Sequence, residues 1–426
     1  MIAAIAARVR AGGRVTADEA LALYHEAPLP LLGELADGIR ARRHPDGVVT
    51  YIIDRNANYT NICVARCTFC AFYRPVGSSE GYVLGFEEIF RKIDETIALG
   101  GNQLLLQGGH NPDLPIAWYE DLFRAIKQRY PAFKLHALSP PEVIHLTRTS
   151  RLTVPEVIDR LVAAGLDSIP GGGAEILVDR VRKLLNCYGK ASSDEWLDVM
   201  RQAHRKGLRT TATMMFGHVE TVDERIEHMV RLRGVQDETG GFTAFITWSY
   251  QPEHTELGGG EASGVEYLRM LALARIVLDN FPSLQASWVT QGGKVGQLSL
   301  AYGANDMGSV MIEENVVRAA GASYCMDEVE IVRNIENAGF VARRRNMHYE
   351  ILGDPYFRQQ DVPRQLALAT ARRDGDTSRA PEIDHYAARS AGEKKARSRP
   401  QTNTENLPQT NTDNPPQANT EQHRLR

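Results

Sequence analysis

The sequence predicts an α/β fold, a (β/α)8 barrel of the TIM type. From Val48 onward, short β-branched apolar runs alternate with amphipathic helical stretches, and such alternation is typical of βαβ units and a parallel sheet. There are eight such runs, which is the number of strands in a closed (β/α)8 barrel. A doubly wound open sheet is the alternative. The eight strand candidates are residues 49–53, 103–106, 134–138, 168–169, 209–216, 243–250, 285–289 and 309–312.

The segments before and between these strands have helical patterns. Residues 1–47 form a predicted helical leader, in which Thr16 can cap a helix that carries Glu19 three residues later. Between the strands, apolar residues recur at helical spacing. The clearest such stretches are FEEIFRKIDETIALGG, VPEVIDRLVAAG, SDEWLDVMRQAHRKG and VEYLRMLALARIVLDNF.

The barrel is predicted to span residues 48–366, and residues 367–426 differ from it in composition. This last segment is polar and contains an imperfect octapeptide repeat, PQTNTENL, PQTNTDNP and PQANTEQH. Because it has almost no large apolar residues, it cannot bury enough surface to offset the entropy of ordering. We therefore expect a disordered tail.

Composition and charge exclude several classes of protein. The 426 residues are 43% hydrophobic and 24% charged, with a formal net charge of −4, so neither nucleic acid nor an anionic membrane is an expected partner. No apolar run is long enough to span a bilayer, and the first residues lack the pattern of a signal peptide. Five cysteines, three of them within eight residues, indicate a metal site in a reducing compartment, the cytoplasm, rather than disulfides.

The cysteine cluster is the strongest functional motif. NYTNICVARCTFCAFYRP places Cys63, Cys67 and Cys70 in C-x3-C-x2-C spacing directly after the first predicted strand. Thiolates are soft ligands that suit iron–sulfur clusters, and three of them leave one iron of a cubane without a protein ligand. A structural zinc site is the alternative, but it requires four ligands, and Cys187 and Cys325 are isolated.

Two glycine-rich segments follow later strands. Gln107, Gly108 and Gly109 come after the second strand, where a backbone without side chains can approach a ligand closely; the alternative is a tight turn. In PGGGAEIL, Glu175 can accept hydrogen bonds from ribose hydroxyls, as acidic residues do in dinucleotide sites. Alternatively, Glu175 stabilises a helix N-terminus.

Polar residues also gather near the end of the predicted barrel, in GANDMG and MIEENVV. Side chains at the C-terminal ends of barrel strands face the active site, which makes Asp306 and Glu313 candidates for catalysis. The alternatives are a turn at Asp306 and a helix start near Glu313.

The motif C-x3-C-x-aromatic-C, with Phe69 at the aromatic position, resembles the radical S-adenosylmethionine (SAM) superfamily. The resemblance implies a 4Fe–4S cluster on the three cysteines and SAM bound to its open iron. It also implies that a radical derived from SAM abstracts a hydrogen atom from the substrate. The residues expected at SAM are Phe69, Phe72, Gln107, Gly108, Gly109 and Glu175.

Further motifs narrow the resemblance to one family of that superfamily. NYTNICVARC, CAFYRP, HALSPPEV, PGGGAEIL, QPEHTEL and GANDMGSVMIEENVV are similar to the cyclic dehypoxanthine futalosine synthases of menaquinone biosynthesis. The resemblance implies abstraction of the ribose C4′ hydrogen of dehypoxanthine futalosine, followed by C–C bond formation to the benzoate ring. It also implies an electron donor such as flavodoxin or ferredoxin.

Within this family, the step after ring closure needs a group that accepts a proton. We expect Asp306 or Glu313 to do so, since the eighth strand adjoins the first in a closed barrel; His110 and His254 are further candidates. Aminofutalosine synthase and the deazaflavin precursor synthase are rival functions. A non-catalytic iron–sulfur electron carrier is a rival of another class, but carriers usually have four cysteine ligands.

Overall fold

A computed structural model describes residues 1–359 of the chain. Residues 360–366 of the predicted barrel and the whole predicted tail, 367–426, lie outside the described residues.

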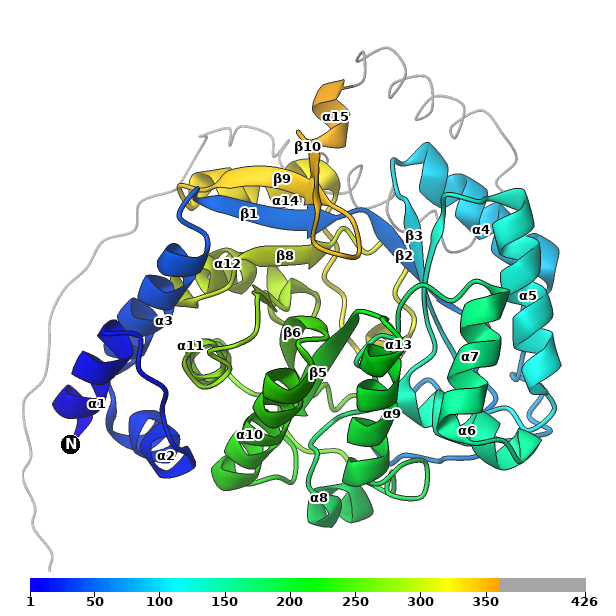
Figure 1. Ribbon diagram of the computed structural model, residues 1–426, viewed down its shortest axis with the longest axis horizontal. Helices are drawn as coiled ribbons and strands as arrows, with labels where there is room; N and C mark the ends of the chain where they lie inside the picture. Colours follow the sequence, from blue (N-terminus) through cyan, green and yellow to red (C-terminus); the bar gives the residue numbers. More distant parts are fainter. Residues whose placement is uncertain (360–426) are drawn as a thin grey trace, which may run out of the picture. The chain divides into compact units, whose positions relative to one another are not determined.

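The barrel is built on one long strand that changes neighbours halfway. β1 (Val48–Ile52) runs directly into β2 (Asp54–Asn58); β1 pairs with β8 (Asp306–Ser309), whereas β2 pairs with β3 (Gln103–Gln107). β3 continues to β4 (Lys134–Ala137), and β8 leads through β7 (Ser283–Gln285) and β6 (Phe242–Ser249) to β5 (Thr210–Phe216), all in parallel. Figure 1 shows β1 and β2 as this continuous ribbon.

The gap between β4 and β5 is bridged by residues 168–169. His136 and Ser168 form a parallel bridge, and the amide of Thr211 donates to the Ile169 carbonyl at 3.4 Å. The predicted fourth strand is thus reduced to a single bridge, but it completes a ring of eight strand positions. The predicted (β/α)8 barrel is confirmed.

Two strand predictions were wrong in their bounds. β7 ends at Gln285, because the chain enters helix α12 (Trp288–Ser299) where the strand was expected to continue. β8 begins at Asp306, three residues before the predicted start, and ends at Ser309. Gly308 within it has φ 72°, a conformation that β-branched residues rarely adopt, so the apolar pattern that marks a strand is interrupted there.

Helices cover the outside of the barrel, and the four helical stretches singled out in the sequence are all present. They are α4 (Phe86–Ala98), α7 (Val154–Ala164), α9 (Ser193–Arg205) and α11 (Gly264–Val277). In Figure 1, α4 and α5 lie outside β2 and β3. The remaining barrel elements are α5 (Ile116–Arg129), α6 (Pro140–Ser150), α8 (Asp179–Leu184), α10 (Val222–Thr239), the short 3-10 helix η1 (Leu300–Tyr302) and α13 (Val316–Ala319).

The leader is three helices, α1 (Ile2–Arg10), α2 (Ala17–Glu26) and α3 (Leu29–Arg43). The predicted cap is confirmed, since the Thr16 side chain accepts from the Glu19 amide and Glu19 in turn accepts from the Thr16 amide. α3 packs on α11, and Arg269 of α11 donates to the carbonyls of Tyr24 and Ala27, both at 2.8 Å.

Residues beyond β8 extend the sheet outside the barrel. β9 (Val341–Arg345) pairs in parallel with β1, and β10 (Ile351–Gly353) pairs antiparallel with β9. α14 (Glu328–Asn337) contacts β9, and α15 (Tyr356–Gln359) is the last described element. Within residues 1–359, no helix has the length and apolar character needed to cross a membrane.

Candidate active site

A cavity of about 410 Å³ lies inside the barrel and is lined by residues of β2 to β8 and of the loops that follow the strands. This is the end of a (β/α)8 barrel where active sites occur. The cavity brings together every residue that the sequence assigns to the cluster or to SAM, namely Cys63, Cys67, Phe69, Cys70, Phe72, Gln107, Gly108, Gly109 and Glu175.

The cysteine loop leaves β2 and is closed on itself by backbone hydrogen bonds. The Cys63 amide donates to the Arg74 carbonyl at 2.9 Å, and the Cys70 amide donates to the Cys67 carbonyl at 3.1 Å. Burial raises the pKa of the Cys67 and Cys70 thiols. Since metal binding requires thiolates, loading of this loop must release protons.

The arrangement of these thiols fits a cluster better than a single ion. Within residues 1–359, no group of three or more His, Cys, Asp or Glu side chains is spaced to hold one metal ion. A closed zinc site needs four ligands around one centre, so the zinc alternative has no support in the part of the chain described. In a cubane each thiolate binds a different iron, and the sulfurs stand further apart.

The Gly108–Gly109 turn packs directly against the cysteine loop. A Cβ at position 109 would lie 2.8 Å from the carbonyl carbon of Ile62 and 2.9 Å from the Cβ of Cys63. The turn is tied to the loop by two backbone bonds, from the Gly109 amide to the Thr60 carbonyl at 2.9 Å and from the Val64 amide to the His110 carbonyl at 3.1 Å. Glycine is therefore required at position 109 by contact with the cluster loop.

A buried carboxylate supports the other half of this turn. Glu142, at the start of α6, accepts from the Gly108 amide at 3.0 Å and from the Tyr59 hydroxyl at 2.7 Å. A Cβ at Gly108 would lie 2.6 Å from the Tyr59 ring. Burial raises the pKa of Glu142. Glu142 lies in the HALSPPEV motif, which by itself does not indicate this role.

Glu175 pairs with a lysine that sequence reasoning missed. The half-buried Lys190 donates from its ammonium to Glu175 Oε1 at 2.7 Å, and its Nζ lies 5.3 Å from the centre of the Phe69 ring. Burial raises the pKa of Glu175, but the charges of Lys190 and Arg182 outweigh it and leave the pKa below its usual value. Lys190 stands in a loop with no recognisable pattern, so only the fold reveals that it lines the cavity.

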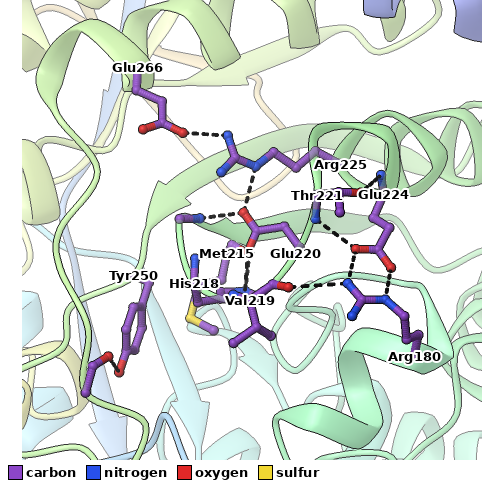
Figure 2. Close-up of polar contacts among 12 residues, drawn as sticks. Arg180, Met215, His218, Val219, Glu220, Thr221, Glu224, Arg225, Tyr250 and Glu266 are labelled. Atoms are coloured by element: carbon purple, nitrogen blue, oxygen red, sulfur yellow. Dashed lines mark hydrogen bonds and ion pairs between the residues drawn. The ribbon is translucent and has the colours of Figure 1, made fainter.

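The loop after β5 is fixed by a buried ion network, shown in Figure 2. The Glu220 carboxylate accepts from Arg225 Nε at 2.6 Å and from the amides of Gly217 at 2.6 Å and His218 at 2.9 Å, and His218 Nδ1 lies 2.8 Å from it. Burial raises the pKa of Glu220, but hydrogen bonding and charge from His218, with the charge of Arg225, lower it to about 2. The network holds the chain at the C-terminal end of β5.

Asp306 and Glu313 occupy different surroundings from those expected. Asp306 is fully buried and accepts two hydrogen bonds from Arg345, at 2.6 and 2.9 Å, and a third from the Thr50 hydroxyl at 2.6 Å. Glu313 accepts from Lys92 at 2.9 Å and Arg55 at 2.8 Å.

Neither carboxylate is among the described residues that line the cavity. The expected adjacency of the first and eighth strands is confirmed, but β8 starts at Asp306, so this residue lies at the beginning of its strand and not at its C-terminal end. Of the other candidates, His110 lines the cavity and stacks on His145 with ring centres 5.0 Å apart, whereas His254 is exposed.

Comparison with known proteins identifies the family. Residues 57–232 match the model of the radical SAM superfamily, and residues 239–357 match the CofH/MqnC C-terminal region. A cyclic dehypoxanthine futalosine synthase of Streptomyces coelicolor is 49% identical over 81% of this chain and 87% of its own. An aminodeoxyfutalosine synthase of Thermus thermophilus is 39% identical over 81% of this chain and 94% of its own.

A solved structure supports the fold assignment. Methylornithine synthase superposes with a TM-score of 0.61 at 19% identity, over 80% of this chain and 97% of its own. The chain therefore belongs to the radical SAM superfamily, in the family of the cyclic dehypoxanthine futalosine synthases and their relatives, and is an enzyme that uses a 4Fe–4S cluster and SAM.

Proposed function

We propose that the enzyme converts dehypoxanthine futalosine to cyclic dehypoxanthine futalosine in menaquinone biosynthesis. One observation carries the proposal: a single cavity of about 410 Å³ joins the three-cysteine loop to the barrel interior and has room for a small substrate. The 49% identity to the Streptomyces coelicolor enzyme of that name supports this choice over the aminodeoxyfutalosine synthase, which is 39% identical.

In this proposal Cys63, Cys67 and Cys70 hold the cluster and leave one iron open for SAM. When bound, the cluster and SAM would supply the chemistry for hydrogen-atom abstraction at ribose C4′. Glu142 and Tyr59 fix the Gly108 turn beside the cysteine loop. The Lys190–Glu175 pair provides one ammonium and one carboxylate for the polar groups of SAM.

The barrel walls contribute by excluding water from the reacting groups, since the cavity lies within the ring of strands. We do not retain Asp306 or Glu313 as the proton acceptor. Each is held in a buried ion pair, Asp306 with Arg345 and Glu313 with Lys92, and protonation would break that pair. Their proposed role is to fix β8 against β1, β9 and α4.

The proposal also covers the protein that donates the electron and the cell compartment in which the enzyme works. A reduced flavodoxin or ferredoxin supplies the electron for SAM cleavage. The enzyme works in the cytoplasm, where thiols remain reduced and free to bind iron.

The proposal is tested by product analysis with matched substrates. Anaerobically reconstituted enzyme is incubated with SAM, dithionite and either dehypoxanthine futalosine or an enolpyruvyl benzoate, and the products are identified by mass. We expect cyclic product and 5′-deoxyadenosine from the first substrate and no adduct from the second. Formation of an adduct with the enolpyruvyl benzoate alone would instead assign the aminofutalosine synthase activity.

A further inference from the structure

Three buried oxygen atoms on residues that line the cavity have no hydrogen-bond partner among the described residues: Asp54 Oδ1, Asn56 Oδ1 and Gln103 Oε1. The second polar atom of each side chain makes a hydrogen bond that fixes the orientation of the side chain. Gln103 Nε2 donates to Asp54 Oδ2, and Asn56 Nδ2 donates to Glu314 at 2.6 Å. The residues are 5%, 6% and 3% exposed. A buried acceptor without a donor is unfavourable, so three of them on residues that line one cavity indicate a ligand that supplies hydrogens.

His136 presents a fourth acceptor to the same cavity. The Ser168 hydroxyl donates its one hydrogen to the Arg209 carbonyl at 2.6 Å. Its oxygen must therefore accept from His136 Nδ1, which lies 2.8 Å away. Burial lowers the pKa of His136 to about 3, so the ring is neutral. With the hydrogen on Nδ1, Nε2 carries a lone pair.

The strand register places these four groups side by side. Asp54 of β2 is paired with Gln103 of β3, while Asn56 and His136 both align with Leu105 one row further along. Because alternate residues of a strand face the same side, the four occupy two successive inward rows on β2, β3 and β4. The cysteines follow the end of β2, so these rows form the floor of the cavity, with the cluster loop above them.

The chemistry of the floor selects its ligand. Three of the four acceptors are neutral, and the described residues provide no single-ion metal site, which argues against a cation. Hydroxyl groups are the natural complement, because each donates one hydrogen. The substrate of the proposed function carries several on its sugar.

We infer that the Asp54–Asn56–Gln103–His136 floor binds the sugar hydroxyls of the substrate. This inference rests on the proposed function and specifies how that substrate is held. Hydroxyls anchored at the floor leave ribose C4′ on the side of the cysteine loop, where its hydrogen is removed. The floor thus acts as a positioning and specificity element for the sugar end.

Asp54→Asn tests the inference. The amide keeps its oxygen towards Gln103 and turns an NH2 donor towards the cavity in place of Oδ1. Asp121→Asn is the matched control, since Asp121 is 67% exposed and outside the cavity. The dissociation constant of dehypoxanthine futalosine and of its monodeoxy sugar analogues is measured anaerobically by calorimetry, on reconstituted, SAM-loaded enzyme without reductant.

We expect Asp54→Asn to weaken binding of the parent substrate about tenfold or more, as for loss of a hydrogen bond to a buried group. One deoxy analogue should bind wild type and variant equally, because its missing hydroxyl is the one that meets Asp54. SAM binding and iron content should be unchanged.

Two results would overturn the inference. Equal affinity of variant and wild type for the parent substrate would show that Asp54 does not meet it. Equal weakening for every analogue, together with loss of SAM binding, would show a structural role only. These outcomes differ from failure of the proposed function, in which the wild-type enzyme itself neither binds nor converts dehypoxanthine futalosine.

Discussion

Gly109→Ala should prevent normal assembly of the cluster although it changes no ligand. The new Cβ would lie 2.8 Å from the Ile62 carbonyl carbon and 2.9 Å from the Cys63 Cβ. The Ile62 atom belongs to the backbone and the Cys63 Cβ is bonded directly to it. Neither contact is with the end of a flexible side chain that could move aside. Relief requires a shift of the cysteine loop, which strains the bonds from Gly109 to Thr60 and from Val64 to His110.

The magnitude follows from these contacts. Overpacking costs about 1–3 kcal/mol, and each of the two backbone bonds contributes about 0.5–1.5 kcal/mol, so we expect a destabilisation of about 2–6 kcal/mol centred on the loop. Iron per chain and SAM cleavage after anaerobic reconstitution are the assays. Gly189→Ala is the control, because a Cβ there has nothing within 4 Å. If Gly109→Ala binds iron and cleaves SAM as Gly189→Ala does, the packing argument is refuted.

Changing any of the three loop cysteines to Ala should abolish SAM cleavage, whereas Cys325→Ala, at an exposed site, should retain it. Glu220→Gln should lower the free energy of unfolding by about 3 kcal/mol at pH 7. The pKa of Glu220 in the folded state is about 2, below the usual 4.5, so ionised Glu220 stabilises the fold fully above about pH 4.5. The difference in free energy of unfolding between wild type and Glu220→Gln should fall to about half by pH 3, and urea titrations at both pH values measure it. Lys190→Met should weaken SAM binding, measured as the spectral change of the oxidised cluster, without loss of iron.

The contiguous motifs explain why much of the site could be predicted. Cys63, Cys67 and Cys70 lie on one short loop, and Gly108 and Gly109 are adjacent, so local spacing alone indicated their chemistry. All line the cavity. The alternation of strands and helices likewise predicted the barrel, since each βα unit is a local pattern.

The residues of the floor could not be predicted in this way. Asp54 and Gln103 are 49 positions apart and meet only because β2 and β3 pair in that register. The β2 strand, DRNAN, is polar yet fully buried, whereas the expected pattern of a buried strand is apolar. Asp306 was misplaced for a related reason: its partner Arg345 belongs to β9, a strand that the sequence did not predict.

Abstraction of the ribose C4′ hydrogen by the radical derived from SAM is tested most directly by following that hydrogen atom. Dehypoxanthine futalosine carrying deuterium at C4′ is incubated with reconstituted enzyme, SAM and dithionite, and the 5′-deoxyadenosine is analysed by mass. We expect one deuterium in each 5′-deoxyadenosine and an equal amount of cyclic product. Unlabelled 5′-deoxyadenosine, or cyclic product formed without SAM cleavage, would contradict it.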